Sequence, residues 1–287
     1  MVLPDFLVKK TPKRENIRRI RNLLDDATLH TVCEEARCPN IGECFSQNTL
    51  TFMLLGDICT RNCRFCGVTQ GDPLPVDPDE PARITSAVNK LNLNYVVITS
   101  VTRDDLADGG AQAFANSIIR LKNSNPRLKI EVLIPDFKGN VDSLKKILAV
   151  QPLVLNHNLE TAQRLYPFIR PQADYQRSLN ILRQSKEINS TVYTKSGFMV
   201  GLGETREEIF ALLEDLKAAN CDLVTIGQYL APSKDHLQPQ RFVDPEEFEA
   251  YEKAGKALGF MEVFSGPFVR SSYRAAEIIR WKNHNVY

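Results

Sequence analysis

Six of the seven cysteines in this 287-residue chain gather in two short segments, CEEARCPNIGEC and CTRNCRFC. The first segment has Cys-x4-Cys-x5-Cys spacing and the second has Cys-x3-Cys-x2-Cys spacing; their cysteines are Cys33, Cys38, Cys44, Cys59, Cys63 and Cys66. The odd total, the crowding and the lack of an apolar secretory core near the start argue against a disulfide framework. The pattern instead favours thiolate ligation of a metal.

Each segment supplies three thiolates, one fewer than a complete four-ligand site needs. Three thiolates from one short loop can hold three corners of a cubane cluster and leave one iron open to a small molecule. A structural zinc site is the alternative, but it normally needs four protein ligands in C-x2-4-C pairs with distant partners. The second segment fits that pattern poorly, and its Phe65 would shield a cluster from solvent. The spacing therefore predicts an iron–sulfur cluster that performs chemistry, with a non-catalytic zinc-stabilised binding module as the rival.

The elements that must position these thiols alternate between strand-like and helix-period segments. Expected strands cover residues 51–58, 94–101, 128–134, 152–158, 191–203 and 222–230. Expected helices cover residues 82–93, 111–124, 140–150, 205–219 and 244–258, with two more between 159 and 187. Short strands rich in Val, Ile and Leu are typical of a parallel sheet covered on both faces. About six βα units predict an α/β fold, a partial parallel (β/α)6 TIM-like barrel, with a doubly wound open sheet as the alternative.

The segments that follow the expected strands are polar or glycine-rich. They read SVTRDDLADGG, NHNLET, GLGET and QYLAPSKDH. In a parallel barrel these positions form the active face. GLGET lacks the G-x-G-x-x-G spacing of a dinucleotide fingerprint, so it does not predict a nicotinamide or flavin site.

CTRNCRFC resembles the cluster loop of the radical S-adenosylmethionine enzymes, and CEEARCPNIGEC resembles the auxiliary-cluster motif of the lipoyl synthases among them. The resemblance continues through RDDLADGG, NHNLET, RPQADYQRSL, KSGFMVGLGET and RSSYRA, and so covers nearly the whole chain. It implies an enzyme, a sulfurtransferase that inserts two sulfur atoms at C6 and C8 of a protein-bound octanoyl-lysine. The nearest rival, a sulfur-inserting enzyme of the biotin synthase kind, would lack the upstream triplet.

The resemblance also implies the cofactors, which are two [4Fe–4S] clusters and S-adenosylmethionine. Cys59, Cys63 and Cys66 are expected to hold the cluster that cleaves S-adenosylmethionine to a 5′-deoxyadenosyl radical. The triplet Cys33, Cys38 and Cys44 is expected to hold an auxiliary cluster that is consumed as the sulfur donor.

The fourth auxiliary ligand is expected from the RSSY segment, where the family uses a serine. Ser272 is favoured and Ser271 is the alternative. Read without the resemblance, both serines would merely cap or turn the chain before an expected helix that starts near residue 275. An oxygen ligand is weaker than a thiolate and suits a cluster that must be dismantled.

Several further residues are expected to contact the cofactor. Asp108, Gly109 and Gly110 resemble the glycine-rich segment that meets the methionine amino group, although Ala111 follows where the family usually has an acidic residue. The remaining candidates, for the ribose or carboxylate, are Asn156, Glu160 and Arg170, with a surface ion pair as the alternative for Arg170. His157 either forms a structural hydrogen bond or contacts the cofactor, and Cys221 is expected to be a buried, inert thiol.

Three regions are expected: an N-terminal extension (1–50) with the auxiliary cysteines, the partial barrel (51–258), and a C-terminal extension (259–287) with the RSSY motif. The tail must then fold back onto the N-terminal extension to complete the auxiliary site.

The expected partners are an octanoylated lipoyl carrier, either a lipoyl domain of an oxo-acid dehydrogenase E2 component or a glycine-cleavage H protein. An electron donor such as ferredoxin or flavodoxin and an iron–sulfur cluster carrier are also expected. A formal net charge of +1 gives no sign of nucleic-acid binding, and no apolar run is long enough to span a membrane. A cytoplasmic location is expected. The basic residues Lys9, Lys10, Lys13, Arg14, Arg18, Arg19 and Arg21 form either a solvated helix face or a surface that steers an acidic carrier.

Overall fold

The computed structural model describes residues 3–9 and 14–277. Its main sheet has eight strands in the order β1-β2-β5-β6-β7-β8-β9-β10. These strands are β1 (His30–Thr31), β2 (Thr51–Leu54), β5 (Tyr95–Ser100), β6 (Lys129–Leu133), β7 (Val154–Asn156), β8 (Tyr193–Val200), β9 (Leu223–Gln228) and β10 (Glu262–Gly266). A separate two-stranded ladder joins β3 (Ile58–Cys59) to β4 (Thr69–Gln70).

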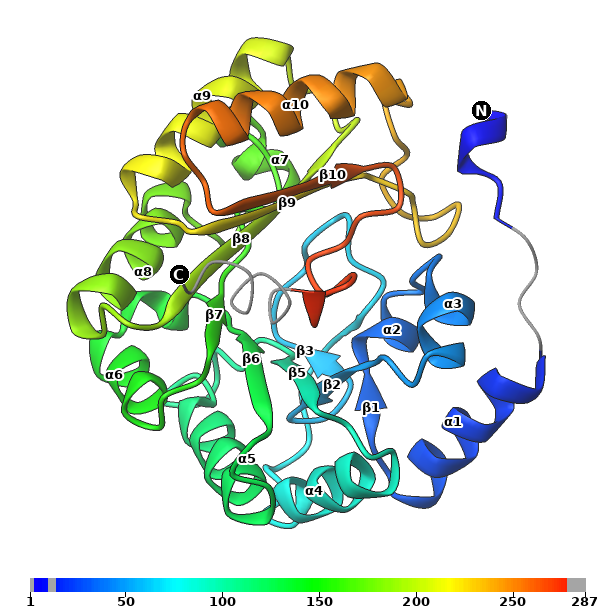
Figure 1. The fold of residues 1–287 in the computed structure, drawn as a ribbon, viewed down its shortest axis with the longest axis vertical. Coiled ribbons are helices and arrows are strands. Elements are labelled where there is room, and N and C mark those ends of the chain that lie inside the picture. Colours follow the sequence, from blue (N-terminus) through cyan, green and yellow to red (C-terminus); the bar gives the residue numbers. More distant parts are fainter. Residues whose placement is uncertain (1–2, 10–13, 278–287) are drawn as a thin grey trace, which may run out of the picture.

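From β2 to β10 every neighbouring pair is parallel and the strands follow chain order, while β1 adds antiparallel to β2. A doubly wound sheet would reverse its strand order at a switch point, and this order does not reverse within the described residues. The sheet curves, and the helices that connect its parallel strands lie outside the curve (Figure 1). The predicted α/β partial barrel is therefore confirmed.

β10 adds one parallel strand to the six that the sequence predicts. It pairs with β9 over five residues, from Glu262↔Leu223 to Gly266↔Gly227. Its segment, EVFSG, is largely half-buried and lacks the continuous apolar run that marks the other strands. β10 lies in the range expected to form the C-terminal extension, and the division of the chain into three regions stays a prediction.

Apart from two short helices that carry cysteines of the first triplet, the helices lie close to where their apolar periodicity predicts them. They are α1 (Arg14–Asp26), α2 (Val32–Glu35), α3 (Ile41–Ser46), α4 (Glu80–Lys90), α5 (Ala111–Ser124), α6 (Val141–Ala149), α7 (Tyr166–Ile169), α8 (Tyr175–Ile188), α9 (Arg206–Ala218) and α10 (Pro245–Ala257), with 3-10 turns η1 (Asp5–Leu7), η2 (Phe137–Gly139) and η3 (Gln163–Leu165). Local chemistry sets several starts: Thr205 and Glu208 form a capping box on α9, and the Asn140 side chain caps α6. None of the described helices is both long and apolar enough to cross a membrane.

The two faces of the sheet have different interiors. On the helix side, Ile98, Val132 and Leu155 are fully buried in the main apolar core. On the opposite side of β6, Glu131 accepts a hydrogen bond from the buried Lys195 ammonium at 2.9 Å and from the Tyr95 hydroxyl at 2.6 Å. This satisfied ion pair fills part of the barrel interior with polar groups, as a buried charge requires.

Candidate cluster-binding site

The loop with the second cysteine triplet begins at the end of β3 and is fastened to the rest of the barrel by backbone hydrogen bonds. Thr60 N–H donates to the Thr102 carbonyl after β5 at 3.0 Å, and Arg64 N–H donates to the Ile169 carbonyl of α7 at 3.0 Å. Within the loop, Cys66 N–H donates to the Cys63 carbonyl at 3.0 Å. The loop is thus a defined turn at the active face, where the sequence predicts it.

The first triplet is carried by two short helices. Cys33 lies in α2, whose first turn is capped by the Thr31 hydroxyl, and Cys44 lies in α3. Cys38 falls between the helices, and its N–H donates to the Cys33 carbonyl at 2.9 Å. Neither helix is long enough to show an apolar period, so the sequence did not predict them.

The two triplets meet at one cavity of about 380 Å³. Cys33, Cys38 and Cys44 line it together with Cys66 of the second triplet. A second cavity, of about 470 Å³, lies against Cys59, Cys63 and Cys66 on one side and Asp235, His236 and Leu237 on the other. Cys66 lines both cavities and therefore lies between them.

The C-terminal segment closes the first cavity. Ser271 and Ser272 are among its lining residues. The Asn40 side-chain amide donates to the Phe268 carbonyl at 2.7 Å, and the Tyr273 hydroxyl donates to the Glu43 carboxylate at 2.9 Å. The segment after β10 bends back over the mouth of the barrel (Figure 1), so the tail and the first triplet line the same cavity.

Burial makes the thiols poor sites for free negative charge. It raises the pKa of Cys33, Cys44 and Cys66 to about 12 and also raises the pKa of Cys63, against the positive charge of Arg170. A bound metal reverses this balance because it deprotonates a coordinating thiol. Within residues 3–9 and 14–277, no three His, Cys, Asp or Glu side chains could hold one shared metal ion. A cubane does not need such convergence, since each thiolate binds a different iron.

Unpartnered polar atoms gather beside the second triplet. Asn158 Oδ1, Arg170 Nε and His157 Nε2 are buried and have no hydrogen-bond partner within residues 3–9 and 14–277. Buried polar groups are normally paired, so these atoms suit a small polar ligand. Glu160 lines the first cavity at φ +68°, and burial raises its carboxyl pKa while Arg170 opposes that rise. These unpaired polar atoms and the Glu160 carboxyl are therefore suited to the amino, carboxylate and hydroxyl groups of S-adenosylmethionine, the cofactor expected from the family resemblance.

The other residues predicted to contact the cofactor do not line either of these two cavities. Asp108 accepts hydrogen bonds from the N–H groups of Gly110 (3.0 Å) and Gln112 (2.8 Å) at the start of α5, and pairs with Lys146 at 3.1 Å. Asp108, Gly109 and Gly110 are not lining residues of the two cavities described here. Asn156 is fully buried, and its amide faces Glu131 inside the barrel at 3.4 Å. The roles of these four residues stay predictions.

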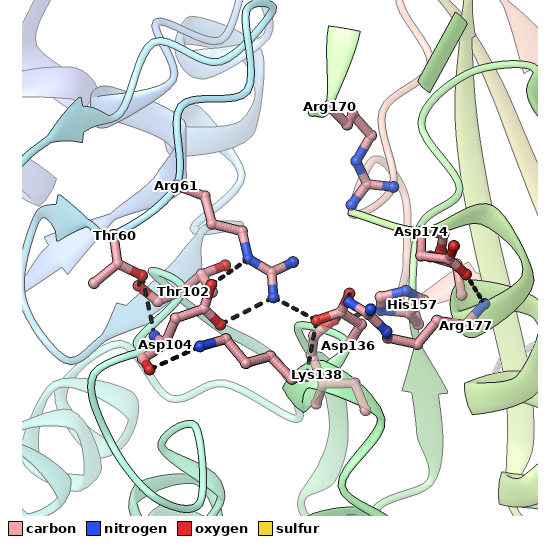
Figure 2. A network of polar contacts seen from close by, with 12 residues as sticks. Thr60, Arg61, Thr102, Asp104, Asp136, Lys138, His157, Arg170, Asp174 and Arg177 are labelled. Atoms are coloured by element: carbon pink, nitrogen blue, oxygen red, sulfur yellow. Dashed lines mark hydrogen bonds and ion pairs between the residues drawn. The ribbon is translucent and has the colours of Figure 1, made fainter. Parts of the chain in front are cut away.

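Sequence reasoning missed the network that anchors the cluster loop. Figure 2 shows the Arg61 side chain reaching between Asp104 and Asp136, which follow β5 and β6. Burial would raise the pKa of Asp136, but the hydrogen bond and charge of Arg61 outweigh it and hold that pKa well below the usual range. His157, directly after β7, donates a hydrogen bond from Nδ1 to the Ile134 carbonyl at 2.8 Å, and its Nε2 accepts none from the described residues.

Two strand glycines were also missed. A Cβ on Gly197 would lie 2.5 Å from Thr225 Oγ1, and a Cβ on Gly227 would lie 2.0 Å from the Val269 carbonyl oxygen. Both line the first cavity. A glycine inside a strand pattern signals close approach of another chain segment, and that signal could have found them.

The basic N-terminal residues make contacts within the chain. Lys9 pairs with Glu43 at 2.9 Å, Arg21 pairs with Glu34 at 2.7 Å, and the Arg19 guanidinium donates to the Asn48 side chain. Lys10 and Lys13 lie outside the described residues. Steering of a carrier by this face stays a prediction. Cys221 is 2% exposed, as expected for an inert thiol.

Two family models and several curated relatives match this chain. Residues 53–227 match the Radical SAM superfamily, and residues 1–38 match the N-terminal domain of lipoyl synthase of that family. Lipoyl synthase of Caldicellulosiruptor saccharolyticus is 53% identical over 274 residues, 96% of each chain. That of Caldicellulosiruptor bescii is 54% identical over 272 residues, 95% of this chain and 94% of the relative.

A solved structure supports the fold. HydG, a maturase of the [FeFe]-hydrogenase, superposes with a TM-score of 0.60 at 14% identity, covering 87% of this chain and 66% of HydG. With matches to both family models and relatives about half identical over nearly its whole length, this chain belongs to the lipoyl synthase family, enzymes of the radical SAM superfamily.

Proposed function

We propose that this chain is a sulfurtransferase that inserts two sulfur atoms at C6 and C8 of an octanoyl chain carried on a lysine of another protein. The shared cavity carries this proposal, because all three cysteines of the first triplet and Cys66 of the second line the same space of about 380 Å³. In the proposal Cys59, Cys63 and Cys66 hold one [4Fe–4S] cluster. Cys33, Cys38 and Cys44 hold a second cluster, the sulfur donor.

When bound, the clusters and S-adenosylmethionine supply the radical hydrogen abstraction and the sulfur that no acid, base or nucleophile provides at an unactivated C–H bond. The protein binds, orients and excludes water. Leu50, Phe198 and Leu230 give the cavity apolar walls that suit an acyl chain. Burial of those walls by the chain would displace water and favour binding.

The cofactor is proposed to lie beside Cys63. Arg170 is fixed there because its guanidinium donates to the Asn158 and Leu159 carbonyls at 3.1 and 2.9 Å, which leaves Nε free. Asn158 donates to Glu160 at 2.9 Å and keeps Oδ1 free. These residues can therefore hold a polar ligand without rearranging their own contacts. Contacts from Asp108, Gly109, Gly110 and Asn156 belong to the proposal as well.

A serine oxygen is proposed as the fourth ligand of the auxiliary cluster. Ser272 is favoured, with Ser271 the alternative, and both line the cavity with the first triplet. A serine ligand would leave the cluster easier to dismantle than a fourth thiolate would.

The proposed acceptor is an octanoylated lipoyl carrier, either a lipoyl domain of an oxo-acid dehydrogenase E2 component or a glycine-cleavage H protein. A ferredoxin or flavodoxin would supply electrons, and an iron–sulfur carrier would rebuild the spent cluster. The reaction is proposed to take place in the cytoplasm.

Anaerobic reconstitution and turnover of an octanoyl-lysine peptide test the proposal. The wild-type chain should hold about eight irons, since each cubane holds four, and mass spectrometry should show two sulfur atoms added to the peptide. Cys38→Ala should hold about four irons and add no sulfur, because it loses an auxiliary ligand.

Cys221→Ala is the matched control, because this thiol is buried away from both cavities. It should keep wild-type iron content and activity. Zinc bound in place of iron, or a wild-type protein that adds no sulfur, would contradict the proposal.

A further inference from the structure

Arg61 lies in the middle of the cluster loop, between Cys59 and Cys63, yet its side chain is only 4% exposed. Arginine is rarely buried unless it is paired. A short polar loop at a barrel mouth would ordinarily place such a residue in solvent. Its buried charge must therefore be paired within the protein, and that pairing affects the position of the neighbouring cysteines.

The partners come from two other strand ends. Arg61 Nε and Nη2 donate to the two Asp104 carboxylate oxygens at 2.7 and 2.9 Å, and Nη2 also donates to Asp136 Oδ1 at 2.6 Å. Asp104 follows β5 and Asp136 follows β6. The fork geometry fixes a guanidinium in direction as well as in distance. One side chain thus ties the loop to the ends of two neighbouring strands (Figure 2).

The two acceptors are themselves held in place. Arg177 of α8 donates to Asp136 Oδ2 at 3.2 Å, and Lys138 N–H donates to Asp136 Oδ1 at 3.1 Å. Asp104 N–H donates to Thr60 Oγ1 at 3.0 Å. The core of the network balances two guanidinium charges against two carboxylates. Such a network is rigid, because removing one member leaves an uncompensated buried charge.

The clamped residue also touches a cluster ligand through its backbone. Arg61 N–H points to Cys59 Sγ with a nitrogen–sulfur distance of 3.4 Å. Hydrogen bonds to cluster sulfurs are among the factors that set the reduction potential of an iron–sulfur cluster. A side chain that fixes this residue therefore also fixes a hydrogen bond to a ligand.

We propose that Arg61 is a positioning residue, whose clamp between Asp104 and Asp136 holds the cluster loop in place and keeps its own N–H on Cys59 Sγ, thereby setting the reduction potential of the cluster. The inference rests on the proposed ligand role of Cys59, Cys63 and Cys66. It assigns no contact between the Arg61 side chain and the substrate.

Arg61→Met tests the inference, because it keeps much of the volume and removes the fork. The control is Arg164→Met, which breaks a two-pronged pair with Glu208 (2.7 and 3.0 Å) on the outer surface. In the apo chains, amide hydrogen exchange of residues 60–66 should speed up in Arg61→Met alone. In the reconstituted chains, an EPR-monitored redox titration should follow the signal that changes when S-adenosylmethionine is added.

With wild-type iron content, Arg61→Met should show a more negative midpoint potential. A tenfold change in the reduction equilibrium corresponds to about 59 mV for a one-electron couple. Cleavage of S-adenosylmethionine should fall roughly 10- to 100-fold, as small misplacements in an active site do. Arg61→Lys should partly restore the midpoint potential and the cleavage rate, since lysine restores the positive charge but not the two-pronged hydrogen bonding of the guanidinium.

If Arg61→Met does not fold, Asp136→Asn provides the same readouts, because it keeps the shape and removes one charge of the clamp. The inference would be overturned if a folded Arg61→Met or Asp136→Asn variant had the same exchange rates, EPR spectrum and midpoint potential as Arg164→Met. The assignment of the cysteine ligands would then remain intact. A wild-type chain that assembles no cluster on Cys59, Cys63 and Cys66 would overturn the assignment and the inference together.

Discussion

His157 is a fully buried imidazole in which the two nitrogens have different surroundings. Nδ1 donates to the Ile134 carbonyl at 2.8 Å, and Nε2 has no hydrogen-bond partner among the residues that the structure describes. The neutral tautomer with the proton on Nδ1 satisfies this arrangement. Burial, aided by the nearby positive charge of Arg170, lowers the pKa of His157 to about 4 against the backbone hydrogen bond and Asp136.

This pKa predicts how stability depends on pH. An unfolded histidine titrates near pH 6.5, so below that pH the unfolded chain binds a proton that the native chain resists. The contribution of His157 is therefore complete above about pH 6.5 and is lost as pH falls toward 4. Between pH 7.5 and 5, the stability of the apo wild type relative to His157→Gln should fall by about 2 kcal/mol, measured by urea unfolding. An equal difference at both pH values would show that the imidazole is not held neutral.

At the scale of single residues, the spacing of cysteines within a short segment could be recognised in the sequence, but ion pairs between distant residues could not be predicted. Both cysteine triplets are local motifs, whereas the return of the RSSY segment to the first triplet was expected only from the family resemblance. The clamp on Arg61 follows from no local motif, because Asp104 and Asp136 are 43 and 75 residues away. Only the completed sheet, with β5 beside β6, brings these carboxylates together.

Among the elements, strands and helices with a clear apolar pattern were predictable to within a few residues. The helix expected at 111–124 is α5 (Ala111–Ser124). α2 and α3 escaped prediction because four and six residues are too short to show a period. β10 escaped because most of its residues are only half-buried, so tertiary pairing with β9 decides its structure.

The contact between β9 and the tail after β10 can be tested by substituting a glycine of β9. Gly227 of β9 lies opposite Gly266 of β10, but only Gly227 closely approaches the backbone of the tail. An added Cβ would lie 2.0 Å from the Val269 carbonyl oxygen, which as backbone cannot rotate away. Gly227→Ala should therefore lower the free energy of unfolding by about 1–3 kcal/mol and increase amide exchange in residues 267–277.

Gly266→Ala is the matched control for that substitution. Its Cβ would lie 3.6 Å from Val269 Cγ2, an ordinary contact. Urea unfolding and hydrogen exchange should leave it close to wild type. If Gly227→Ala behaves like Gly266→Ala, the tail does not press on β9 as the structure describes.

On the scale of the whole molecule, three segments far apart in the sequence converge beside the first cysteine triplet. Lys9 pairs with Glu43 at 2.9 Å and lies over the Phe268 ring at 4.5 Å. Tyr273 donates to the same Glu43 carboxylate at 2.9 Å. Glu43 therefore joins the N-terminal segment and the tail at a position next to Cys44. No local pattern could predict this junction, because Glu43 lies 34 residues from Lys9 and 230 residues from Tyr273.

The junction predicts that the tail opens when one tie is removed. Tyr273→Phe keeps the ring and deletes the hydroxyl that reaches Glu43. A hydrogen bond contributes about 1 kcal/mol net, which corresponds to a roughly fivefold larger open population. Trypsin cleavage after Arg270 and Arg274, followed by mass spectrometry, should speed up by that factor, since proteolysis tracks the open state when closing is fast.

Glu249→Gln is the control for this cleavage experiment, because it removes a carboxylate from an exposed pair with Lys253 on α10 (3.9 Å). Its cleavage rate in the tail should equal that of the wild type. Glu43→Gln should loosen the tail at least as much as Tyr273→Phe, because it weakens the ties to Lys9 and Tyr273 together. Unchanged cleavage in both variants would mean that packing alone, and not this polar junction, holds the serines over the cysteines.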